Sequence, residues 1–322
     1  MLCGAGYLRF VFAETVTEEQ SMLRTLAGLI LLALAATTGA AEPARIDKNV
    51  IYGMYSGLAL LMDVHRPAKP NGYGVIFISG SGWQAPMTYG ATPLKEQQIG
   101  IWGPSLLQAG YTVFAINHRA APRFHYPAAV EDVQRAVRFV RHHAREYRIE
   151  AERLGGIGGS SGGYLIGLVA MLAAPGIADD ADEVNREPAT LQTVVLRAAP
   201  TDLRTFTGLA MVSFMERLPD QTPEDKDVYR AASPITHVSQ SSPPVLLMHG
   251  DSDDVVPYQQ SVAMEAALKA ADVTVKLLTI PGGKHGPNFG TAEQPHALLP
   301  LALKESVSWM DVNLRRISPG TK

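Results

Sequence analysis

The sequence predicts an α/β protein with a mostly parallel sheet of about eight strands and helices on both faces. From Ile46 onward, short apolar segments alternate with segments of helical periodicity. The apolar segments are nearly continuous, as in strands that are buried on both faces. Strands separated by helices are typical of βαβ units, which place their strands in parallel.

Seven strands are expected from short segments in which Val, Ile, Leu or Phe predominate. They are residues 58–64, 75–79, 111–117, 153–158, 193–197, 245–248 and 273–280. Helices are expected over 100–108, 127–144, 164–172, 258–271 and 298–314. The second helix is the clearest, because Val130, Val133, Val137 and Val140 recur at helical spacing and form one apolar face.

Two irregular stretches interrupt the pattern. Residues 84–98 directly follow the end of a predicted strand, and residues 175–238 are polar, Pro-interrupted and weakly helical. We expect the longer stretch to form a small cap region that contributes to the wall over a site. No segment has the composition of a linker between two domains.

Composition excludes several classes of function. The chain has 322 residues, 46% hydrophobic and 18% charged, with a net charge of −3. It can therefore bury a core, and it lacks the basic surface that nucleic-acid binding requires. Its single cysteine, Cys3, precedes the expected mature chain. Disulfides, cysteine zinc sites and a thiol nucleophile are thus excluded from that mature chain.

Residues 22–41 have the pattern of an export signal. Arg24 precedes an apolar run over 26–36, and small residues occupy 37–41. This arrangement predicts a signal peptide over 22–41, with 1–21 as an upstream extension and 42–322 as the mature domain. The run of 11 residues is too short to span a bilayer, so we expect a secreted or periplasmic protein without a stable membrane anchor.

A glycine-rich turn between a predicted strand and a predicted helix suggests a nucleophile. Residues 159–163 (GSSGG) match G-x-S-x-G with Ser161 at the centre. In that context the motif indicates a nucleophile elbow. The alternatives are a glycine turn without chemistry and a phosphate-binding loop. The second fits poorly, because Ser161 stands where that motif needs glycine.

A serine nucleophile needs a base and an acid that orients the base. His285, flanked by glycines after the last predicted strand, is the candidate base. Asp251, Asp253 and Asp254 follow the preceding strand, and chain pattern does not decide between them. Both groups come at carboxyl ends of strands, where open α/β sheets place their sites.

Stabilisation of an oxyanion requires N–H donors near the nucleophile. One is expected from Gly162, and others from residues 79–83 (SGSGW) after the strand 75–79. Within this stretch, Trp83 either forms a floor for the pocket or simply packs.

Five stretches together resemble the hormone-sensitive-lipase-like esterases of the α/β-hydrolase superfamily, most closely the bacterial carbohydrate acetyl and feruloyl esterases. They are residues 77–83 (FISGSGW), 116–129 (INHRAAPRFHYPAA), 154–165 (LGGIGGSSGGYL), 249–257 (HGDSDDVVP) and 282–286 (GGKHG). The first departs from the family pattern H-G-G-G-W, which puts the conformation of that loop in question.

The resemblance implies the α/β-hydrolase fold and a set of roles. Ser161 would be the nucleophile and His285 the base, and Asp253 the acid because it lies four residues before Pro257. The oxyanion donors would be Ser81, Gly82 and Gly162, and the substrate contacts Trp83 and Ser160.

The expected function is a secreted serine carboxylic-ester hydrolase that forms an acyl-enzyme. Short-chain or carbohydrate-linked acetyl and feruloyl esters would be its substrates, and it would need neither metal nor organic cofactor. One alternative is a serine peptidase of the prolyl-oligopeptidase type, whose motifs HGDSD and SPIT also occur here. The other is a non-catalytic binding module with a hydrolase fold. The sequence does not define an oligomeric state.

Overall fold

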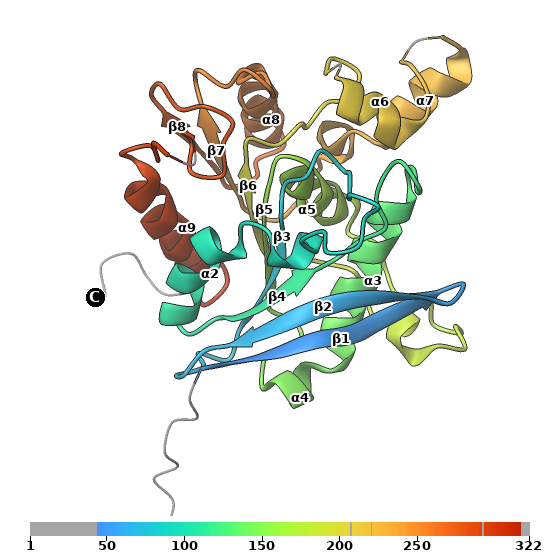
Figure 1. Ribbon diagram of the computed structural model, residues 1–322, viewed down its shortest axis with the longest axis vertical. Coiled ribbons are helices and arrows are strands. Elements are labelled where there is room, and N and C mark those ends of the chain that lie inside the picture. Colours follow the sequence, from blue (N-terminus) through green and yellow to red (C-terminus); the bar gives the residue numbers. More distant parts are fainter. Residues whose placement is uncertain (1–43, 207, 220, 292, 317–322) are drawn as a thin grey trace, which may run out of the picture. The chain divides into compact units, whose positions relative to one another are not determined.

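An eight-stranded sheet forms the centre of the computed structural model, which describes residues 44–206, 208–219, 221–291 and 293–316. The strands are β1 (Arg45–Tyr55), β2 (Leu58–Arg66), β3 (Gly74–Ile78), β4 (Thr112–Ile116), β5 (Leu154–Gly159), β6 (Thr193–Arg197), β7 (Val245–Gly250) and β8 (Val275–Ile280). They lie in the order β1-β2-β4-β3-β5-β6-β7-β8. The pairs β1–β2 and β2–β4 are antiparallel and the other pairs are parallel, which confirms the predicted sheet (Figure 1).

Helices cover both faces of this sheet and also occur in the irregular region after β6. They are α2 (Ile99–Gln108), α3 (Ala128–His142), α4 (Ala144–Tyr147), α5 (Ser161–Leu172), α6 (Leu209–Met215), α7 (Pro223–Ala231), α8 (Gln259–Ala270) and α9 (Leu299–Asn313). Short 3₁₀ turns occur at η1 (Leu94–Glu96), η2 (Glu183–Arg186) and η3 (Pro234–His237). Alternate residues of β3 enter two apolar clusters: Ile76 and Ile78 pack with α3 and α5, whereas Val75 and Phe77 pack with α2 and α9.

Strand β1 was not among the strands expected from the sequence. It is an edge strand that pairs only with β2, and most of its side chains are exposed. Its sequence, RIDKNVIYGMY, therefore lacks the continuous apolar character by which the buried strands were recognised. Register shifts between Asp47 and Val50 and between Ile51 and Gly53 further disturb its alternation.

The start of α5 differs from the prediction in a way that affects the site. The helix begins at Ser161, three residues before the expected start at Tyr164. Glycines 162 and 163 have low intrinsic helix propensity, which explains why the sequence predicts a helix start that is three residues too late. They are helical here because the first turn of α5 packs tightly against β3 and β5.

The irregular region after β6 forms a small cap beside the glycine loop that follows β3. Helices α6 and α7 lie together there (Figure 1), joined by an ion pair between Arg217 and Asp225. Phe214 of α6 stacks on Trp83 with ring centroids 5.0 Å apart. The carbonyl of Phe214 also accepts a hydrogen bond from the N–H of Tyr126 at 2.9 Å. The predicted cap is thus present and is anchored on the loop that carries Trp83.

The predicted export signal (22–41) and the extension before it (1–21) lie outside the described residues. Among the described helices, none has the length and apolar character needed to cross a bilayer.

Candidate active site

Ser160 occupies a sharp turn between β5 and α5. Its backbone adopts a φ of 52° and a ψ of −126°, a strained conformation for a residue with a side chain. Its N–H donates to the carbonyl of Arg197 at 2.8 Å, and its carbonyl accepts from the N–H of Tyr164 at 2.9 Å. The turn is therefore fixed on both sides and projects one hydroxyl beyond the carboxyl end of the central strand.

Two glycines make this turn possible. A Cβ on Gly158 would lie 2.4 Å from the carbonyl oxygen of Gly162, and a Cβ on Gly162 would lie 2.3 Å from the carbonyl oxygen of Ile78. Both distances are far below van der Waals contact, so neither position accepts a larger residue. These two glycines flank Ser160 symmetrically, which makes residues 158–162 (GGSSG) the register of the motif that the structure uses.

The prediction that Ser161 contacts His285 is wrong. His285 Nε2 lies 2.9 Å from the Oγ of Ser160. Ser161 is completely buried at the first position of α5, where its Oγ accepts the N–H of Ser81 at 2.9 Å. The sequence contains G-x-S-x-G in two overlapping registers, and the structure uses the one that begins at Gly158. Ser160, assigned from sequence to substrate contact, holds the position expected of the nucleophile.

His285 links this serine to a carboxylate. Its Nδ1 lies 2.9 Å from Asp253 Oδ2, and its side chain is 19% exposed. Because a carboxylate can only accept, Nδ1 carries the proton and Nε2 accepts the hydroxyl of Ser160. An unbroken chain of hydrogen bonds thus runs from hydroxyl to imidazole to carboxylate.

Asp253 is held in its ionised form. Burial by itself raises the pKa of this carboxyl. Hydrogen bonds from His249 and His285, the charge of His285 and the N–H of Val256 outweigh burial, and they lower the pKa of Asp253 well below its ordinary value. Its Oδ1 also accepts the N–H groups of Val255 and Val256, each at 2.9 Å. The acid is therefore both charged and fixed in orientation.

His249 is a supporting residue that sequence reasoning had not assigned to the site. It is completely buried, and its Nε2 lies 3.0 Å from the carbonyl of Val256 and 3.2 Å from Asp253 Oδ2. Both partners are acceptors, so Nε2 carries the proton and Nδ1 accepts the hydroxyl of Ser261 at 2.7 Å. The four-residue spacing of His249 and Asp253 in HGDSD was the signal that could have indicated it.

The contacts of the three candidate acids distinguish them. Asp253 bonds the histidine, as the family resemblance implied. Asp251 instead accepts the N–H of Gly282 at 2.7 Å and so secures the base of the histidine loop. Asp254 is 68% exposed and lies 3.9 Å from Lys284. Of these three aspartates, Asp253 is the one that contacts His285.

The loop after β3 packs directly against the elbow. A Cβ on Gly80 would lie 2.9 Å from Ser160 Cβ, and Gly82 adopts a φ of +63°. The N–H of Ser81 points to the same turn, where it reaches Ser161 Oγ. With Ser160 at the elbow, the N–H that follows the nucleophile belongs to Ser161 and not to Gly162. The N–H of Ser81 already donates to Ser161 Oγ, so the remaining candidate donors for an oxyanion are Gly82 of this loop and Ser161, which replaces Gly162.

Trp83 lies beneath this loop and not in an open pocket. It is 2% exposed, and its ring stacks on Phe214 and meets Tyr164 edge-on at 5.2 Å. The position supports the second of the two roles weighed from the sequence, that of packing. Trp83 holds the loop and does not offer a face to a substrate.

A groove of about 470 Å³ opens beside Ser81. Its other walls include Gln84, Met87, Gln97 and Pro122. None of the side chains that line it is charged. The expected irregular stretch 84–98 therefore forms the wall of a cavity that reaches the candidate oxyanion loop.

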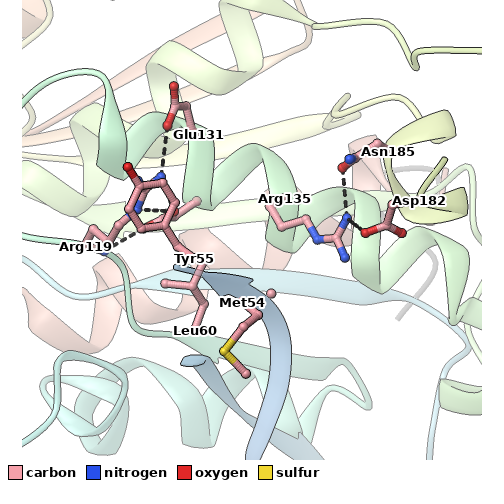
Figure 2. A pocket seen from close by; sticks show the side chains of 10 residues that line it. Met54, Tyr55, Leu60, Arg119, Glu131, Arg135, Asp182 and Asn185 are labelled. Carbon is pink, nitrogen blue, oxygen red and sulfur yellow. Dashed lines mark hydrogen bonds and ion pairs between the residues drawn. The ribbon is translucent and has the colours of Figure 1, made fainter. Parts of the chain in front are cut away.

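A second hollow, of about 350 Å³, lies between β1, α3 and η2 (Figure 2). Its charged groups already satisfy one another. Arg119 pairs with Asp132 at 2.7 Å and with Glu131 at 2.9 Å, and Arg135 pairs with Asp182 at 2.7 Å. It offers no nucleophile or base and is not a competing candidate for the active site.

Within the part of the chain that the structure describes, no three His, Cys, Asp or Glu side chains gather as a possible metal site. The groups that meet at the candidate site are an alcohol, an imidazole, a carboxylate and main-chain N–H donors. That set is suited to acyl transfer.

A profile of the BD-FAE family matches residues 62–268, which is more than half of the chain. Esterase LipQ of Mycobacterium tuberculosis is 32% identical over 224 residues, which span 66% of this chain and 49% of LipQ. The chain thus spans about half the length of that curated relative.

Two solved structures have the same fold. A bifunctional GH43-CE protein of Bacteroides eggerthii has a TM-score of 0.69 and 26% identity, and the match covers 83% of this chain and 38% of that one. A truncated carbohydrate esterase from gut microbiota has a TM-score of 0.62 and 25% identity, with 84% of this chain and 99% of that one covered. The family resemblance inferred from the five sequence stretches is confirmed.

Proposed function

Because the chain belongs to the BD-FAE family, we propose that it is a serine carboxylic-ester hydrolase with Ser160 as nucleophile, His285 as base and Asp253 as acid. The observation that carries this proposal is the continuous hydrogen-bonded chain from Ser160 Oγ through the imidazole to the buried carboxylate. The relatives' names, esterase and carbohydrate esterase, support the same reaction class.

The reaction proceeds in two acyl transfers. Ser160 Oγ attacks the ester carbonyl while its proton passes to His285 Nε2. The negative charge that develops on the carbonyl oxygen is stabilised by the N–H of Ser161 and by the loop N–H of Gly82. The tetrahedral intermediate collapses, the C–O bond to the alcohol breaks, and the imidazolium protonates the leaving oxygen.

Hydrolysis of the acyl-enzyme mirrors the first step. A water molecule gives its proton to His285 and attacks the acyl carbon, and the returning proton restores the hydroxyl of Ser160 as the acid leaves. Asp253 remains ionised throughout and keeps the proton of His285 on Nδ1. The start of α5 favours negative charge at this point, because its first N–H groups have no intrahelical partner.

The groove beside Ser81 supports a neutral substrate. Its amides and its Pro and Met side chains suit a group that combines hydroxyls with an apolar face. Short-chain esters and carbohydrate-linked acetyl or feruloyl esters are the proposed substrates. The pattern over residues 22–41 remains the basis for proposing a secreted or periplasmic enzyme.

A panel of substrates tests the reaction class. Purified protein is expected to hydrolyse an aryl acetate and an acetylated xyloside, and to leave a peptide anilide intact. Cleavage of the anilide alone would instead favour the peptidase, and no turnover of any substrate would favour the binding module. The Ser160→Ala variant, purified in the same way, measures any hydrolysis that comes from contaminating esterases.

A further inference from the structure

Arg197, the last residue of β6, is a buried cation beneath the candidate site. It is 3% exposed, and no carboxylate of the described residues lies within ion-pair distance of it. Burial lowers the pKa of Arg197 to about 10, although the charge of Asp253 opposes this effect. The guanidinium therefore remains positive at neutral pH in a position where an unpaired charge is costly. The free-energy cost of burying this charge suggests that Arg197 has a functional role.

The contacts of Arg197 join two parts of the site that are far apart in sequence. Its carbonyl accepts the N–H of Ser160 at 2.8 Å. Its Nη1 donates to the carbonyls of His285 at 3.0 Å and Gly286 at 3.2 Å. One residue thus bonds the main chain of the serine and the main chain of the histidine.

The sequence of the elbow makes room for this side chain. A Cβ on Gly159 would lie 2.1 Å from Nη2 of Arg197 and 2.6 Å from its Cζ and Nε. The guanidinium consequently lies against the bare backbone of Gly159, directly before Ser160. On the other side it lies 5.9 Å from the ring centroid of Phe289, which belongs to the segment after the histidine loop.

We propose that Arg197 is a positioning residue: its guanidinium holds the His285 loop in register with Ser160, and its charge acts on the His285–Asp253 pair. The inference rests on the proposed function of that pair. Moving either loop by a fraction of the hydrogen-bond length would break the contact between Nε2 and Oγ. The charge of Arg197 interacts with that of Asp253, and removing a cation from the neighbourhood of an imidazole makes an imidazolium easier to form.

Other charged and titratable groups of the described residues lie around the pair or its loops. His249 bonds Asp253, Lys284 neighbours Asp254, and His296 bonds the carbonyl of Pro281 at the start of the histidine loop. Each of these remains in place when Arg197 is substituted, so a changed pH profile would report on Arg197.

The test compares Arg197→Met and Arg197→Lys with the wild type. For Arg197→Met we expect kcat to fall about 100-fold with little change in KM, as for a misplaced catalytic group. The ascending limb of kcat against pH is expected to move to higher pH. Arg197→Lys keeps the charge but not the two-carbonyl contact, so its limb should return to the wild-type position while kcat stays low.

Arg141 provides a matched control. It is also buried, at 2% exposure, and donates to the carbonyls of Pro188, Ala151 and Thr190, away from the elbow and the histidine loop. Arg141→Met is expected to lower the unfolding temperature without moving the pH limb. If Arg197→Met does not fold, Arg197→Lys carries the test.

Three results would overturn the proposal. The first is a kcat in a folded Arg197 variant within about threefold of the wild type. The others are an ascending limb of the kcat–pH profile that stays in place in Arg197→Met, or one that moves as far in Arg141→Met. The low-field proton resonance of the hydrogen bond between His285 and Asp253 gives a readout without substrate. Its titration should shift in Arg197→Met even if the wild type hydrolyses no ester, which separates this proposal from the proposed function.

Discussion

The elbow and the groove wall, which meet at Ser81, are built in opposite ways. The N–H and the carbonyl of Ser160 are both hydrogen-bonded, and the close approaches of Gly158 and Gly162 leave no room for a methyl group. Along the groove, Met87 is 70% exposed and the nearby Tyr89 is fully exposed. The difference indicates that packing determines the chemistry of the site, whereas side chains open to solvent determine what enters it.

The groove wall is nevertheless anchored. Lys95, behind it, forms a buried ion pair with Asp63 at 2.7 Å, and the N–H of Ala85 donates to the carbonyl of Ala121 at 3.2 Å. Its backbone is therefore held while its side chains stay free. Removing the hydroxyl of Ser160 should abolish turnover, whereas substitutions in the groove should adjust selectivity.

The largest effect is expected at the two adjacent serines. Ser160→Ala should lower kcat/KM for an aryl acetate by about 10⁴-fold or more, because it removes the nucleophile. Ser161→Ala loses only a hydrogen bond to the loop and should cost far less. Steady-state kinetics on both variants gives the comparison, and a greater loss in Ser161→Ala would reverse the assignment.

The next effect concerns the acid. Asp253→Asn should lower kcat by about 10³- to 10⁴-fold, since the amide no longer fixes the protonated nitrogen of His285. Asp251→Asn loosens only the base of the histidine loop and serves as the matched control. Near-equal losses in the two variants would mean that loop anchoring, and not orientation of the imidazole, is what the aspartates supply.

A smaller effect is expected in stability at low pH. The pKa of Asp253 is lower in the fold than in an unfolded chain, so its carboxylate stabilises the fold above the ordinary value of about 3.9. That contribution is lost as the pH falls through this value toward the pKa in the fold. Urea unfolding at about pH 5 and about pH 3 should therefore show a smaller difference between wild type and Asp253→Asn at the lower pH.

The smallest effect is expected in the groove. Gln84→Leu should lower kcat/KM for an acetylated xyloside relative to ethyl acetate by about two- to tenfold, the range of one exposed hydrogen bond. Gln221→Leu, at an exposed position before α7, is the control. An unchanged ratio would remove Gln84 from the selection of substrate.

Most of the fold could be predicted because seven of the eight strands are short apolar segments, five of which are completely buried. β1 escaped prediction because an exposed edge strand need not be apolar. His285 and Asp253 could be placed because each follows a strand and belongs to a recognisable loop. Gly250 and Gly283 bring these loops together, since a Cβ on Gly250 would lie 2.1 Å from the carbonyl oxygen of Gly283.

The nucleophile could not be fixed from the sequence, because residues 158–163 satisfy the motif in two registers. The choice depends on which glycines lie against other backbone, and that is a property of the packed chain. Arg197 likewise left no local signal. Its role depends on Gly159, in the neighbouring strand, and on a loop about 90 residues further along the chain, whose carbonyls it contacts.

Covalent labelling tests the central assignment most directly. The wild-type protein is treated with an organophosphate such as paraoxon, and the peptide that spans the elbow is sequenced by fragment-ion mass spectrometry. One diethyl phosphoryl group on Ser160 is the predicted result, with labelling retained in Ser161→Ala. A phosphoryl group on Ser161, or an unlabelled elbow in protein that has lost its esterase activity to the reagent, would contradict it.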